Sequence, residues 1–105
     1  MLFEVSTDSN IEGNDSFTDQ VEAVVRGALD HQRDQITRVS VHLTDENSDK
    51  KFGLEDMRCQ IEVRLSGHQP ISVSHKAETV EEAVDGAAEK MKNSLESTLG
   101  RLETH

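Results

Sequence analysis

Residues 57–76 read MRCQIEVRLSGHQPISVSHK, and the alternation in this stretch decides the fold. Apolar and polar side chains alternate over 57–65 and again over 71–76, on either side of the run Gly-His-Gln-Pro at 67–70. A period of two is typical of a β-strand with one buried face, and a short run with glycine and proline between two such strands is typical of a hairpin. The stretch therefore predicts two antiparallel strands.

Two earlier stretches alternate in the same way. Residues 2–7 place Phe3 and Val5 on one side, and residues 37–44 place two valines and a leucine on one side. Residues 45–54 are polar and rich in turn formers, which predicts a loop before the hairpin. The chain therefore contains four predicted strands, each with one apolar and one polar face.

Two other segments have the period of a helix. From 14 to 36, apolar residues recur three and four positions apart, which predicts an amphipathic helix. Its apolar stripe consists of Phe17, Val21, Val24, Val25, Ala28 and Leu29. A second helix is predicted to begin at Thr79, because Thr79 and Glu82 form a Thr-x-x-Glu capping box ahead of the longest apolar stripe in the chain.

The predicted order is β-α-β-β-β-α. Strands with one polar face suit a sheet that is covered on one side only, and each helix has a single apolar stripe to cover it. We therefore expect an α+β two-layer sandwich, in which two helices pack on one face of a four-stranded, mostly antiparallel sheet. Residues 1–105 are expected to form one domain of this kind.

The charge excludes one simple function. The 105 residues include 11 Lys and Arg against 21 Asp and Glu, for a net charge of −10 and a pI near 4.8. A small domain that wraps duplex nucleic acid needs a basic excess, because neutralisation of phosphates supplies most of the affinity. Any contact with RNA must therefore come from a local basic surface, or from recognition of a specific site rather than net attraction.

Sorting the charges by segment locates such a surface on the uncovered face of the sheet. The two helical segments each carry an acidic excess, whereas the outward strand positions are mostly basic. Few acids oppose them, chiefly Glu62, with Glu4 as a second. This pattern fits an anion-binding face, and it fits equally well outward positions that are charged for solubility and edge protection. The outward bases are Arg38, His42, Arg58, Arg64 and Lys76, with Lys50 and Lys51 in the adjoining loop.

The residues that could carry covalent chemistry do not form a recognisable site. Cys59 alternates with the apolar side of its strand, so a buried structural thiol is expected rather than a nucleophile. The five histidines have no metal-ligand spacing, and no phosphate-binding glycine loop is present. We predict neither enzymatic activity nor a metal or cofactor. With no apolar leader or membrane-length run, a cytoplasmic location is expected.

The order of elements and several short runs resemble the ribosome hibernation-promoting and ribosome-associated inhibitor family, also called sigma-54 modulation proteins. The resemblance covers nearly the whole chain and is closest to a short, acidic branch. The runs that carry it are Thr7–Gly13, Val41–Asn47, Arg58-Cys59, Gly86–Lys90 and Leu99–Leu102.

This resemblance implies a cytoplasmic protein that binds the small ribosomal subunit through ribosomal RNA and blocks translation by occupying the mRNA and tRNA sites. It also implies basic contacts from the last helix, where Lys90, Lys92 and Arg101 stand among six acids. No membrane and no small-molecule substrate are expected. The full set of candidate RNA-binding residues is Arg38, His42, Lys50, Lys51, Arg58, Arg64, Lys76, Lys90, Lys92 and Arg101.

An alternative function stays open at this point. The chain could be a protein-interaction module that kept the fold without binding RNA, using its acidic helix faces or forming a homodimer through the sheet. The charge distribution on the open sheet face distinguishes these two candidate functions. A continuous positive patch favours the ribosome, whereas interruption by acids favours the interaction module.

Overall fold

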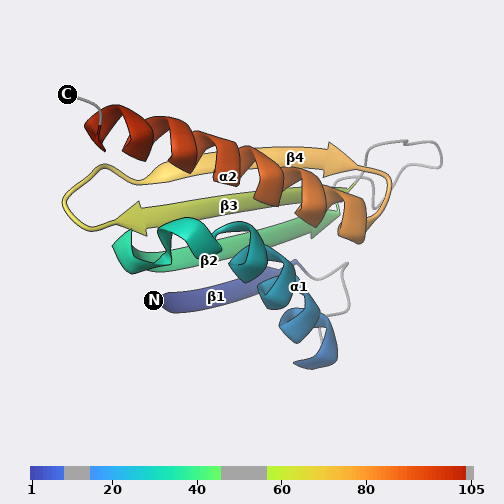
Figure 1. The fold of residues 1–105 in the computed structure, drawn as a ribbon. Helices are drawn as coiled ribbons and strands as arrows, with labels where there is room; N and C mark the ends of the chain where they lie inside the picture. Colours follow the sequence, from blue (N-terminus) through green and yellow to red (C-terminus); the bar gives the residue numbers. More distant parts are fainter. Residues whose placement is uncertain (9–14, 46–56, 104–105) are drawn as a thin grey trace.

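The computed structural model describes residues 1–8, 15–45 and 57–103, and it has the predicted α+β two-layer architecture (Figure 1). The predicted loop residues Lys50 and Lys51 lie outside the described residues, as does most of the predicted turn after the first strand. The elements in chain order are β1 (Leu2–Thr7), α1 (Asp15–Ala28), the 3-10 helix η1 (Asp30–Gln35), β2 (Ile36–Asp45), β3 (Met57–Leu65), β4 (Ile71–Ala77) and α2 (Val80–Glu103).

The four strands form one sheet in the order β1-β2-β3-β4. β2, β3 and β4 are antiparallel neighbours, whereas β1 lies parallel to β2 with Glu4 beside Ser40 and Ser6 beside His42. A parallel pair needs a crossover connection, and α1 with η1 provides it. The sheet is therefore mixed, with two of its three pairings antiparallel.

Both helices cover the same face of the sheet (Figure 1). α2 packs along β3 and β4, while α1 contacts β1 and the side of α2. The core lies between the layers and consists mainly of aliphatic side chains, with Met91 and the thiol of Cys59, and Phe3 and Phe17 pack against it. Its largest fully buried side chains are Leu29, Leu43, Ile61, Met91 and Leu95.

The predicted turn and helix cap are present. Gly67 has a φ of +76° in the β3–β4 turn, a backbone conformation that glycine adopts without steric cost. At the start of α2, the Thr79 hydroxyl accepts a hydrogen bond from the Glu82 backbone N–H at 3.1 Å and donates one to the Glu82 carboxylate at 3.1 Å. These contacts satisfy an N–H group that the first helical turn leaves unpaired.

The first helix differs from the prediction in two ways. It does not continue to residue 36, because the polar run after Leu29 offers no apolar stripe and the chain tightens into η1. The Leu29 N–H is shared between the carbonyls of Val25 and Arg26, which marks the change from α to 3-10 spacing. In addition, Val24 is 41% exposed, so only part of the predicted stripe reaches the core.

In the described ranges, no helix is long and apolar enough to cross a membrane.

Candidate nucleic-acid interface

The face of the sheet opposite the helices carries the predicted outward residues. Along each strand the side chains alternate between the buried core and this open face, so residues in register form rows across it. All five strand positions predicted to point outward lie here, and each is exposed or half-buried. They are Arg38, His42, Arg58, Arg64 and Lys76.

The four lysine and arginine residues of this face form two pairs. Arg38 on β2 lies opposite Arg64 on β3, and Arg58 on β3 lies opposite Lys76 on β4. Arg58 and Arg64 are six residues apart on one strand, which separates the two pairs by about 20 Å at the rise of a β-strand. The positive charge is therefore concentrated at two ends of the face.

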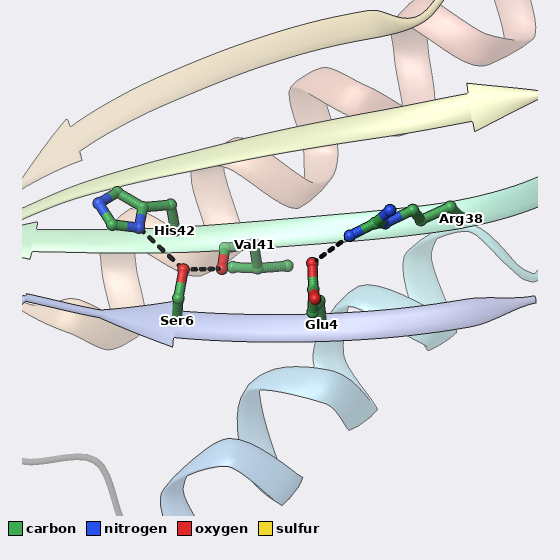
Figure 2. Close-up of polar contacts among 5 residues, drawn as sticks. All are labelled: Glu4, Ser6, Arg38, Val41 and His42. Carbon is green, nitrogen blue, oxygen red and sulfur yellow. Dashed lines mark hydrogen bonds and ion pairs between the residues drawn. The ribbon is translucent and has the colours of Figure 1, made fainter.

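One of these bases is held by an acid from the neighbouring strand. The Arg38 guanidinium donates a hydrogen bond from Nη2 to Oε1 of Glu4 at 2.6 Å, linking β1 to β2 (Figure 2). This hydrogen bond, together with the negative charges of Glu4 and Glu62, raises the pKa of Arg38 above its ordinary value. Both side chains of the pair are largely exposed, so the pair adds little to stability but competes with any phosphate for the guanidinium.

The region between the two basic pairs contains acids and polar side chains but no lysine or arginine in the described strands. One row across the sheet contains Glu4, Ser40, Glu62 and Ser72 in register. Glu62 is half-buried on β3, directly between the two ends of the face. Acids thus interrupt the positive surface, and the continuous patch that would favour RNA binding most strongly is absent from the described part of the face.

The next row consists of polar side chains without lysine, arginine or acid: Ser6, His42, Gln60 and Ser74. The Ser6 hydroxyl lies 2.9 Å from Nδ1 of His42 and 3.5 Å from the carbonyl oxygen of Val41, to which it donates (Figure 2). Activation of a serine requires a base that a third group orients. No carboxylate bonds His42 in the described ranges, so this exposed pair serves better as hydrogen-bonding surface than as a nucleophile.

The two bases of the last helix whose side chains are described, Lys90 and Lys92, do not form a cluster on the open face. The Lys90 ammonium donates to the backbone carbonyl of Ser74 at 3.0 Å, which brings it to the outer edge of β4. Lys92 is half-buried and lies two residues on, about 200° around the helix and thus on the other flank. Arg101 lies on α2, and its side chain is outside the described residues.

Cys59 is fully buried on the core side of β3, as its position in the alternation predicts. Burial raises the pKa of its thiol from 9.0 to about 12. A thiol with such a pKa is protonated at neutral pH and unreactive. Among the described residues, no group of three or more His, Cys, Asp or Glu side chains is arranged to hold a metal ion.

Comparisons with known proteins give a consistent result. A family model described as sigma 54 modulation protein / S30EA ribosomal protein matches residues 4–103. The N-terminal domain of Thermus thermophilus Protein Y is a similar solved structure, with a TM-score of 0.71, 21% identity, and coverage of 92% of this chain and 97% of that one. Comparison with curated proteins finds no match.

A second similar structure is described as a ribosomal subunit interface protein from Coxiella burnetii. It has a TM-score of 0.72 and 14% identity, and the alignment covers 95% of this chain and 99% of that chain. At these identities the two structures establish a shared fold. Since nearly the whole of each chain is aligned, the likeness includes both the sheet and the helix layer.

Proposed function

Because this chain belongs to the sigma 54 modulation protein / S30EA ribosomal protein family, we propose that it is a ribosome-associated hibernation factor that binds the small ribosomal subunit. It would act in the cytoplasm by occupancy, as a rigid module that fills a site used in translation. No bond needs to form or break in this action. The observation that carries the proposal is the family match over 4–103, which includes β2, β3 and β4 in full and residues 4–7 of β1.

The open face suggests how such a module would contact RNA. Two basic pairs about 20 Å apart suit phosphates several nucleotides apart, with the polar row that contains Ser6 and His42 in reach of sugars between them. Glu4 and Glu62 would keep phosphates away from the middle. Contact at two separate points favours one fixed RNA shape over any flexible strand.

The net charge of −10 supports selectivity in this scheme. Non-specific RNA binding depends almost wholly on phosphate neutralisation, and an acidic chain gains little from it. Binding would therefore depend on a site whose shape complements the module. We expect weak affinity for arbitrary RNA and measurable affinity for the small subunit.

Co-sedimentation with purified small subunits through sucrose gradients, at low and at physiological salt, tests the proposal. Arg64→Gln removes one exposed base of the open face, whereas Arg33→Gln makes the same charge change on η1, away from that face. We expect co-migration of the native protein, and a salt slope that Arg64→Gln lowers by about 0.7–0.9. Absence of co-migration at low salt, or equal effects of the two variants, would contradict the proposal.

A second candidate is a protein-interaction module that does not bind the ribosome, either alone or as a homodimer. The observation that favours it is the interruption of the positive face by Glu62 and by the Glu4–Arg38 pair. A stable dimer that shields Arg64 from solvent, measured by light scattering and chemical modification, would favour this candidate if small subunits also fail to bind.

A further inference from the structure

The helix layer contains a groove that the proposed RNA contacts do not use. α1 and the N-terminal half of α2 lie side by side over the sheet (Figure 1). Residues of both helices line a groove of about 590 Å³. Its volume falls in the range of concave binding sites, which is about 300–1,000 Å³. It opens on the side of the molecule away from the open sheet face.

The surface of the groove is largely apolar. Val21 and Val84 are only 4% and 3% exposed and form its floor. Phe17 and Val80 are half-buried at its sides, and Val24 is 41% exposed although it belongs to the apolar stripe of α1. These side chains form one apolar strip along the helix pair, of the kind that receives the apolar face of another chain.

The charge around the groove has one sign. Glu81 and Asp85 line it directly from α2, and both are exposed. Residues 15–25 and 80–89 contain no lysine or arginine, so neither helix supplies a base to this part of the surface. Among the residues that line the groove, Glu81 and Asp85 are the acids, and they face an incoming partner.

We propose that this groove binds a cationic amphipathic segment of a protein partner. Apolar side chains of the segment would lie on Val21, Val24 and Val84, while lysine or arginine side chains would pair with Glu81 and Asp85. Nucleic acid is excluded as the occupant, because the acids would repel its phosphates. The inference does not rest on the proposed function, since the groove and the open sheet face lie on opposite sides of the molecule.

A designed probe tests this directly. The probe is a short synthetic peptide of leucine and lysine, ordered so that the leucines line one side of a helix, and its control is the same composition in scrambled order. Binding to the intact chain is measured by fluorescence anisotropy at physiological ionic strength, and backbone amide shifts locate the peptide. We expect the largest shifts at residues 17–24 and 80–85, and weak binding of the scrambled peptide.

Two variants with equal charge change separate the groove from general attraction to an acidic protein. Asp85→Lys reverses a charge at the groove, whereas Glu96→Lys reverses an exposed charge on α2 beyond it. We expect Asp85→Lys to weaken binding about tenfold or more and Glu96→Lys to change it less than about twofold, because water and salt screen distant charges. Val24→Ser, at an exposed apolar position, should weaken binding severalfold.

Several results would overturn the inference. These are equal losses in the two lysine variants, peptide shifts confined to other surfaces, equal binding of the scrambled peptide, or a second copy of this chain occupying the groove in a dimer. Circular dichroism and thermal unfolding of each variant show whether it remains folded. A failure here leaves co-sedimentation with small subunits unaffected, so the two proposals are tested separately.

Discussion

The imidazole ring of His75 lies directly against the backbone of Gly86. A β carbon built at Gly86 would overlap the ring, so glycine is required where α2 crosses the edge of β4. The contact brings helix and strand closer together than any larger residue would permit. It also explains why a residue that normally weakens helices stands inside the N-terminal half of the longest helix.

Substitution of this glycine should destabilise the protein although alanine is the better helix former. In Gly86→Ala, the overlap with His75 costs about 1–3 kcal/mol, against about 1 kcal/mol gained in helix propensity. Gly27 lies in α1 with nothing near its β-carbon position, so Gly27→Ala should stabilise by about 0.5–1 kcal/mol. Urea unfolding of both variants measures the two opposite signs.

The same contact predicts coupling between its two partners. In a double-mutant cycle, His75→Ala should remove most of the cost of Gly86→Ala, because the overlapping ring is gone. Additive free energies of unfolding across the cycle would show that the ring moves aside in the variant at no cost.

Removal of the acid that holds Arg38 should strengthen binding to RNA. In Glu4→Gln, the Arg38 guanidinium loses its ion-pair partner and becomes available to a phosphate. We expect affinity for the small subunit to rise about three- to tenfold and the salt slope to steepen by about 0.7–0.9. Stability should fall by less than about 1 kcal/mol, since the pair is exposed.

Glu22→Gln is the matched control for this change. It also removes one negative charge and one ion pair, here with Arg26 on α1, but on the helix layer rather than the open face. If both variants bind small subunits equally well, the gain comes from net charge, and the position of Arg38 on the sheet is irrelevant.

The buried thiol predicts a loss of stability in alkaline solution. The pKa of Cys59 is about 12 in the folded protein and near 9.0 when exposed, so between these values the unfolded chain releases a proton that the folded chain retains. The contribution of the thiol to stability is therefore fully present well below pH 9 and falls as pH rises, by roughly 1 kcal/mol from pH 8 to pH 10. Urea unfolding at the two pH values measures the change, and Cys59→Ala should lack this component.

The cap of α2 predicts a graded response to substitution. Thr79→Ala removes the acceptor for the Glu82 N–H and should lower the free energy of unfolding by about 1 kcal/mol. Thr79→Ser keeps a hydroxyl in the same place and should stay within about 0.5 kcal/mol of the native protein. A full loss in the serine variant would assign the effect to the methyl group instead of the hydrogen bond.

Much of the fold follows from local patterns in the sequence. Strand alternation over 57–65 and 71–76, and the Thr79–Glu82 cap, depend on neighbouring residues and were predictable for that reason. The end of α1 was predicted too late, because the polar residues after Leu29 form a 3-10 helix instead. The burial of Val24 was also predicted wrongly, because the apolar stripe of α1 is wider than the part of the helix that packs on the core.

The candidate site was less predictable. The face on which Arg38, Arg64 and Glu62 lie follows from alternation, but their neighbours across the sheet depend on strand register. The Glu4–Arg38 pair joins residues 34 positions apart and requires β1 to lie parallel to β2, which no local pattern specifies. Likewise, an edge contact such as that between Lys90 and Ser74 needs the position of α2 over β4.

The parallel placement of β1 has a consequence for the order in which parts of the protein open. From β2 onward, each strand lies beside the strand that follows it in the chain. β1, in contrast, pairs with β2 only after the chain has passed through α1 and η1, so this pairing has a larger entropic cost of loop closure. β1 is also an edge strand, with Leu2 70% exposed. Its amides should therefore exchange with deuterium before those of β3. Such an opening would release Arg38 and His42 in one event, so the charge of the sheet edge depends on how long its first strand stays docked.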